Sequence, residues 1–227
     1  MTRFLALLLL AVTATPSHAA ERRFSIQSFD RIRMEAPFDI MLSTNKSPTA
    51  KAEGAVAALD TVDLKVEGRT LIVRQRSGWN GEGKGSPIRL TIGTPELSAA
   101  TLIGSGRLQV DRMRGLSVSL ALAGPGLLKV ADLRADRLNL VAGGSGSVAL
   151  AGAIKTGNVS TEGSVVLDAA DLAAEELVLV ATGSSELRAA ARRSVTVTAS
   201  GASTVTLQGP VACIQKITGA ATVSGCR

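Results

Sequence analysis

The sequence predicts an all-β protein, a right-handed parallel β-helix of about 19 residues per coil that is preceded by a β-rich N-terminal region. Three features of the 227-residue chain predict this fold. A corner of small residues recurs seven times in the second half, and short alternating apolar runs lie between these corners. No aromatic residue follows Trp79. Repeats of this length are typical of solenoids, and the interior of a narrow coil has little room for aromatic rings.

Residues 1–19 have the pattern of a secretory signal peptide. Arg3 is followed by an apolar run over residues 4–12, and the small residues Ser17 and Ala19 precede the expected cleavage site. The apolar run has about half of the roughly 20 residues that span a bilayer, and no later segment reaches that length, so no transmembrane span is predicted. We therefore expect an exported protein, in the periplasm, on the outer cell surface or outside the cell.

The mature chain offers little chemistry for catalysis. His18, the only histidine, lies in the expected leader, and its removal excludes Ser–His and Cys–His catalysis and His-ligated metal sites. In an oxidising compartment Cys213 and Cys226 are expected to form one disulfide, with two buried free thiols as the alternative. Without a histidine or a C-x-x-C motif to activate either sulfur, a thiol enzyme is disfavoured.

Residues 20–97 are predicted to form a β-rich region continuous with the solenoid. Period-two apolar spacing indicates strands over residues 32–42 and 62–73, with a hairpin turn at Gly68. The Gly- and Ser-rich segment 77–86 is predicted to be a mobile loop or linker, and a strand over residues 88–92 follows it. This region contains all the aromatic residues of the mature chain, and we expect it to cover one open end of the solenoid.

Residues 98–227 are predicted to form the coils. The corners begin at Gly104, Gly124, Gly144, Thr161, Gly183, Gly201 and Gly219. Four and six residues after each corner come paired, mostly apolar positions, from Leu108/Val110 to Val223/Gly225. A leucine-rich repeat has a similar length, but the Asn/Cys slot and the leucine spacing that it needs are absent. The right-handed sense follows from the crossover rule for parallel strands, and the expected disulfide would hold the last, incomplete coil.

Acidic residues near the bends are the best candidates for a catalytic or metal site. Asp111, Asp132 and Asp171, with Asp136 and Asp168 nearby, could form a stacked ladder that holds a cation, as in polysaccharide-active β-helices. The alternative is that each aspartate caps a turn, with its side chain accepting hydrogen bonds from nearby backbone amides. We favour turn caps, and we predict no enzyme, no metal and no cofactor, because the coils also lack aromatic residues that stack on sugars.

A basic edge is the best candidate for ligand binding in this chain, which has a net charge of +6. Its residues fall on similar parts of successive coils, and Glu175 and Glu176 interrupt it. Such an edge could attract acidic polysaccharide, lipopolysaccharide or another surface protein, or it could simply keep strand edges from aggregating. Nucleic acid is not expected, because neither an RNA-binding motif nor an aromatic platform is present. The edge comprises Arg112, Arg114, Arg134, Arg137, Arg192 and Arg193, with Lys155 between them.

The chain resembles a known bacterial family over residues 28–218. The resemblance begins with Phe29-Asp30-Arg31-Ile32 and Ala36-Pro37-Phe38-Asp39-Ile40, and it continues through Leu71-Ile72-Val73, Pro95-Glu96-Leu97 and Gly104-Ser105-Gly106. In this order the segments are similar to the head GIN domain family, which is named for auto-transporter adhesins. The resemblance implies a signal peptide, a β-helix and an adhesin-like role, and it carries over no catalytic or ligand-binding residue.

The sequence therefore predicts an exported, non-enzymatic binding protein of the cell envelope that recognises polymers or surface ligands. A secreted polysaccharide-active enzyme and a purely structural envelope component are the alternatives. Self-association through sheet faces or open ends is a further expectation.

Overall fold

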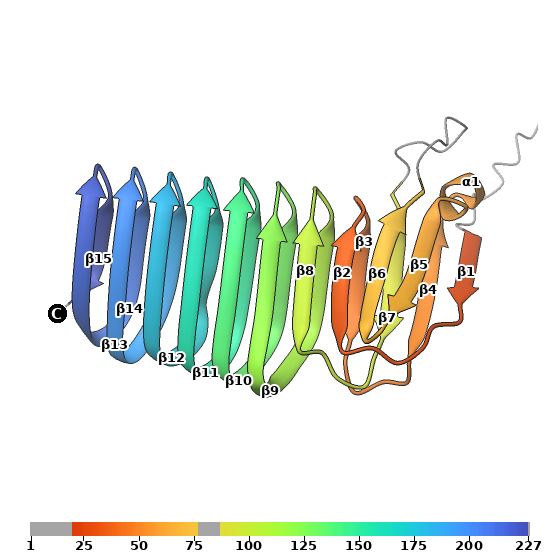
Figure 1. Ribbon diagram of the computed structural model, residues 1–227, viewed down its shortest axis with the longest axis horizontal. Helices are drawn as coiled ribbons and strands as arrows, with labels where there is room; N and C mark the ends of the chain where they lie inside the picture. The colour runs from red at the N-terminus through yellow and green to blue at the C-terminus, as the bar shows by residue number, and fades with distance from the viewer. Residues whose placement is uncertain (1–19, 77–86, 227) are drawn as a thin grey trace, which may run out of the picture.

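The computed structural model describes residues 20–76 and 87–226, and it shows a single row of stacked coils (Figure 1). The expected leader over residues 1–19 and the expected linker over residues 77–86 lie outside the described residues. In the described part, no helix is long and apolar enough to cross a membrane.

Six long strands each follow most of one coil, and a short strand ends the row. Each pairs in parallel with the next, so the predicted parallel β-helix is confirmed. In sequence order they are β9 (Arg107–Ala123), β10 (Leu127–Gly144), β11 (Ser147–Gly163), β12 (Val166–Gly183), β13 (Glu186–Gly201), β14 (Thr204–Gly219) and β15 (Thr222–Cys226).

Each coil has two flat walls joined by a bend and a corner. Wall A is the first part of each long strand, residues 107–110 in β9, and wall B is the second part, residues 117–123 in β9. The bend lies between them, and the corner is the tight turn before the next strand, at Gly124 after β9. Along both walls every second side chain points inward and is buried.

The N-terminal region continues the same two walls, but its coils are stacked out of sequence order. On wall B, β2 (Arg31–Glu35) lies in parallel between β6 (Thr70–Gln75) and β8 (Ala99–Ile103). On wall A, β3 (Asp39–Ser43) lies in parallel between β7 (Arg89–Gly93) and β9. The coil made of β2 and β3 therefore comes first in the chain and sits between two later coils.

Antiparallel strands and a short helix lie at the start of the row, which we call the head end (Figure 1). β1 (Ala20–Phe24) pairs with β4 (Thr49–Gly54), β4 pairs with β7, and β5 (Val62–Glu67) pairs with β6 across the predicted turn at Gly68. The helix α1 (Val56–Leu59) follows β4, and the Arg22 side chain donates hydrogen bonds to the Leu59 carbonyl and the Asp60 carboxylate.

The core is a continuous column of aliphatic side chains. The inward positions of successive coils stack on one another, so Leu108 lies under Leu128, which lies under Val148. All three are fully buried, and so are Leu187 and Val205 further along. Burial of such side chains contributes about 1.5–3 kcal/mol each relative to exposure, which makes this column the main source of stability.

The corner glycines have a backbone conformation that other residues adopt only under strain. They have φ values between +78° and +110°, and they are separated by 20, 20, 19, 20, 18 and 18 residues. A Cβ atom added to Gly183 would lie 2.5 Å from the carbonyl oxygen of Gly163 in the preceding coil, so successive corners also approach too closely for a side chain. The column consists of Gly104, Gly124, Gly144, Gly163, Gly183, Gly201 and Gly219.

One predicted corner is wrong by two residues. The sequence analysis placed the fourth corner at Thr161, but Gly144 pairs with Gly163, so the inward pair of that coil is Leu167/Ala169 and not Val165/Leu167. Residues alternate between the two faces of a strand, so a shift of two leaves the inward and outward faces unchanged. Val165 and Leu167 are both buried, so the pair that the sequence predicted does consist of inward residues, although it is shifted by one inward position.

The coils differ in length at their bends. The register shifts lie between Val130 and Leu133, between Ala149 and Gly152, and between Ala169 and Glu176, all outside the two walls' central positions. The corners keep their register throughout. The bend is therefore the variable edge of the solenoid, and most of the predicted functional residues lie there.

We predict that Gly183→Ala destabilises the protein and that Gly143→Ala does not. The first change forces a positive φ on alanine and a clash with Gly163, which should cost at least about 2 kcal/mol. The second change is the control. Gly143 lies next to the corner glycine Gly144, but it has open space around its Cβ position and no positive φ, so alanine fits there. Urea denaturation followed by circular dichroism measures both, and equal midpoints would contradict the role assigned to the corner.

Candidate functional site

The structure places the predicted basic edge along the bends. Arg112 and Arg114 lie on β9, Arg134 and Arg137 on β10, and the remaining pair, Arg192 and Arg193, on β13. All six arginines are exposed. The bends of these coils also contain most of the acidic catalytic candidates, whereas Asp168 lies on the outward face of wall A.

Asp132 is the centre of an ion-pair cluster. Its carboxylate lies 3.0 Å from Nε of Arg134, 3.2 Å from Nε of Arg112 and 3.6 Å from a terminal nitrogen of Arg114. The hydrogen bond from Arg134 is the largest cause that lowers the pKa of Asp132 below its usual range, and Arg112 adds to it while partial burial opposes it. Three of the six arginines therefore share one ionised carboxylate.

Other charges of the edge are paired as well. Lys155 lies 2.8 Å from the Asp136 carboxylate, and this hydrogen bond raises the pKa of Lys155. Arg193 binds Glu175 at 2.8 Å and Glu176 at 3.1 Å. Within residues 20–76 and 87–226, Arg137 and Arg192 form no ion pair. The bend edge is thus close to electrically balanced, with two arginines free for other contacts in the described part of the chain.

Two of the remaining candidate acids make hydrogen bonds to the backbone, and the third, Asp171, is exposed on β12 and makes no side-chain hydrogen bond or ion pair within residues 20–76 and 87–226. Asp168 accepts one from the amide of Ala170 at 3.4 Å, which is the turn-cap arrangement. Asp111 instead accepts from the amide of Thr44 at 2.9 Å and from its hydroxyl at 3.2 Å, and so ties β9 to the end of β3. Among the described residues, no three His, Cys, Asp or Glu side chains gather in a way that could hold a metal ion.

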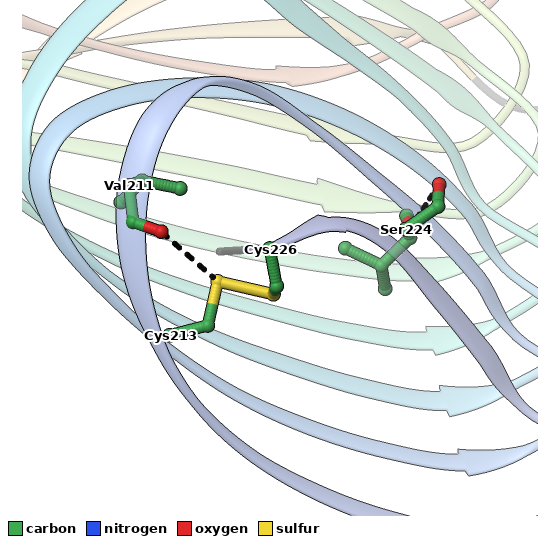
Figure 2. Close-up of a disulfide and its surroundings, with 5 residues drawn as sticks. Val211, Cys213, Ser224 and Cys226 are labelled. Carbon is green, nitrogen blue, oxygen red and sulfur yellow. Dashed lines mark hydrogen bonds between the residues drawn. A yellow bond between two sulfur atoms is a disulfide. The ribbon is translucent and has the colours of Figure 1, made fainter.

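The predicted disulfide between Cys213 and Cys226 is confirmed (Figure 2). Cys226 ends β15 beside Val211 of β14, and Cys213 is the first inward residue of wall B in the same coil. The Cα atoms are 5.5 Å apart, and the bridge closes a 13-residue separation. Restricting the unfolded chain over a loop of this size contributes about 3 kcal/mol. The bridge fastens β15 to the last coil.

The structure also shows an uncharged surface on wall B that the sequence analysis missed. It consists of the two central outward columns of five coils, none of them charged, and we call it the neutral strip. The equivalent ten positions of wall A include five charged residues, namely Arg107, Lys129, Asp168, Glu186 and Arg188. The neutral strip comprises Ser119, Ala121, Asn139, Val141, Asn158, Ser160, Val178, Val180, Thr196 and Thr198.

A groove crosses the middle of the neutral strip. It lies over three coils, and the Asn158 amide donates a hydrogen bond of 3.4 Å to the Asn139 side-chain oxygen of the neighbouring coil. Val178 contributes apolar surface to this groove, because 44% of the residue is exposed. The misplaced corner at Thr161 hid this arrangement, because that register stacks Asn158 on Val141 and separates the two asparagines. The groove is lined mainly by Asn139, Val141, Asn158, Ser160, Val178 and Val180.

Comparison with known proteins agrees with the fold. A sequence family described as "Putative auto-transporter adhesin, head GIN domain" matches residues 28–210. The chain belongs to this family. The resemblance noted from the sequence is therefore correct, and the head GIN domain family accounts for nearly all of the described residues.

Solved structures of low sequence identity have the same fold. A "putative adhesin" from Bacteroides fragilis superposes with a TM-score of 0.81 at 16% identity, covering 91% of this chain and 95% of that one. A "putative lipid binding protein" from Parabacteroides distasonis gives 0.68 at 18% identity, covering 92% and 96%. A "putative adhesin" from the same species gives 0.69 at 19% identity, covering 92% and 97%. No curated protein matches the chain significantly.

We predict that Asp132→Asn destabilises the protein at neutral pH and that the effect fades in acid. The folded pKa of Asp132 is lowered, so its stabilisation is present above the unfolded pKa of about 3.9 and is lost as pH falls through the folded value. The arginines are half exposed, so the loss at pH 7 should be below about 1 kcal/mol. Urea unfolding at pH 7 and near pH 3 measures it, with Asp171→Asn as the control. A loss that persists unchanged near pH 3 would contradict the ion-pair account.

Proposed function

We propose that the protein is an exported, non-catalytic binding module of the cell envelope that recognises an extended, uncharged polymer through its neutral strip. The observation that carries the proposal is the contrast between the two walls. Ten outward positions of wall B over five coils contain no charge, whereas half of the matching positions of wall A are charged. Exposed apolar surface rimmed by polar groups is typical of interaction sites.

The chemistry of the neutral strip suits a hydroxyl-rich polymer. Asparagine, serine and threonine side chains both donate and accept hydrogen bonds, and the valine methyl groups cover apolar surface between them. With coils spaced at about 4.8 Å, five coils present a straight, flat face about 20 Å long. The face repeats at a fixed interval, which favours a ligand that also repeats, such as a neutral glycan chain.

The family and its relatives support a binding role. The family name and two of the similar structures refer to adhesins, and another similar structure is named for lipid binding. The disulfide and the leader-like residues 1–19 favour an exported protein. The acids do not favour glycoside hydrolysis, because a general acid needs a raised pKa, whereas the pKa of Asp132 is lowered by its arginines.

A second candidate ligand is an acidic polymer on the bend edge. Arg137 and Arg192 favour it, since no ion pair engages either within the described ranges of the chain. An acidic polysaccharide or lipopolysaccharide phosphate would contact these two guanidinium groups. Such binding depends on exposed charges and should weaken strongly with salt, whereas binding to the neutral strip should not.

We predict that Val178→Lys abolishes binding to a neutral glycan and that Val166→Lys preserves it. The two valines are equally exposed, at 44% and 45%, but Val178 lies in the neutral strip and Val166 lies on wall A. A lysine in the groove places a hydrated charge against the polymer and should weaken binding at least tenfold. The measurement is a glycan array with neutral glucans and acidic pectin-like polymers, followed by titration of the best binder.

The control pair for this experiment is Arg137→Glu with Arg192→Glu at low and high salt. Binding that is insensitive to salt and to this pair, but lost in Val178→Lys, supports the neutral strip. Loss in the arginine pair together with strong salt dependence would assign the ligand to the bend edge instead. Cleavage of a polymer that Asp132→Ala abolishes would overturn the non-catalytic assignment.

A further inference from the structure

At the tail end of the solenoid, made of β14 and β15, the two walls end at different strands, and we call this feature the step. On wall A, β15 covers β14, pairing with residues 204–206 and with Val211. On wall B, residues 212–219 of β14 pair with β13 and, in the described chain, with no strand beyond it. Wall A is therefore one strand longer than wall B at this end.

The step leaves the interior of the last coil open. Gln215 and Ile217 continue the inward columns of Val197 and Ala199, which are fully buried one coil earlier. Ile217 is nevertheless 42% exposed, and Ile214, on the outward face of the same strand, is 73% exposed. The backbone edge of residues 214–218 is exposed with them. An open strand edge with apolar side chains is a site for pairing with another strand.

Charged residues on the edge strand discourage association at the head end, whereas the tail end has almost none. The edge strand β5 contains Asp63, Lys65 and Glu67, and Arg22 of β1 binds the end of α1. By contrast, residues 194–226 contain a single charged residue, Lys216. Charged residues on edge strands prevent edge-to-edge association. The open edge has only Lys216, on its outward face, and this near absence of charge indicates that the tail end is covered in the working protein.

We propose that a second copy of this chain covers the tail end, in a two-fold symmetric dimer. A two-fold axis parallel to the strands exchanges wall A and wall B and reverses the stacking direction. It places β15 of the partner copy on residues 214–218 of wall B, and β15 of the first copy on wall B of the partner. The two half coils then complete one closed coil between the molecules.

The strand directions and lengths suit this arrangement. Strands on the two walls of a coil run in opposite directions, and a rotation about an axis parallel to them preserves direction. The new pairs are therefore antiparallel, which is a favourable ladder. β15 has 5 residues, and it fits within the open edge of residues 212–219 that it would cover. The interface is the same patch on both copies, as closed two-fold dimers require.

The disulfide prepares this interface. It joins the end of β15 to the first inward residue of wall B, so the protruding strand is fixed to the coil before association (Figure 2). Without the bridge, β15 would be held by one strand edge alone and would fray. The proposal therefore links the oxidised state of Cys213 and Cys226 to dimerisation.

The test is the mass of the protein in solution by analytical ultracentrifugation between 1 and about 100 μM. The full chain is expressed with its own leader and purified after export. The wild type should have twice the mass of one chain, and Ile217→Lys should weaken the dimer at least tenfold. Ile217 is already partly exposed, so a lysine there leaves the monomer folded, which circular dichroism checks. Val166→Lys, an equally exposed change on wall A away from the tail end, should remain a dimer.

Two further variants complete the test. Replacing both Cys213 and Cys226 by serine should also weaken the dimer, because β15 is then no longer fixed. Val66→Lys, on edge strand β5, should leave the dimer intact. A wild type that is monomeric at the highest concentration would overturn the proposal. A mass that keeps rising with concentration in the wild type, but not in Val66→Lys, would also overturn the proposal. That result would show that the head end of one molecule stacks on the tail end of the next.

Discussion

The close stacking of the corner glycines is the constraint on which the rest of the structure depends. Each corner turns the chain through a backbone conformation suited to glycine, and from Gly124 onward each lies so close to the preceding corner that a side chain would crowd its backbone. Successive coils are therefore held in register at one edge, and both walls pair along their length. Differences in coil length accumulate at the opposite edge, the bend, where no such contact exists.

This division explains where function can arise. The inward faces of the walls form the aliphatic core, and most charges of the bend pair with one another through Asp132, Asp136 and the pair Glu175 and Glu176. The neutral strip of wall B and the open tail end, where Lys216 is the single charged residue of residues 194–226, are the two surfaces with the least charge. The proposed ligand recognition uses the first surface and the proposed self-association uses the second, so the two would not compete for one surface.

The sequence predicted the coil repeat and most of the inward pairs, because spacing and alternation are local properties of the chain, and it predicted the disulfide because an exported chain with two cysteines favours one bridge. Three features were not predictable in this way. The corner at Gly163 lacks the Gly-x-Gly form of the three corners before it, whereas Thr161-Glu162-Gly163 resembles that form, so the predicted register separated the asparagine pair of the neutral strip. The coil of β2 and β3 lies between two coils that come later in the chain, and the order of residues does not reveal the order in which coils stack. The pairing of Arg112 and Arg114 with Asp132 depends on neighbours one coil away.

Removal of one complete coil tests most directly whether stacked corners govern the fold. Deleting residues 164–183 joins Gly163 to Ser184 and brings two equivalent corners into register, since Gly163 and Gly183 pair with each other. The account predicts a shorter but folded solenoid, with strand content by circular dichroism and cooperative unfolding retained at a stability cost. Deleting only residues 164–173 should unfold the second half, because half a coil exchanges the walls. If both deletions unfold the protein alike, or both are tolerated alike, the corner stack does not govern the fold.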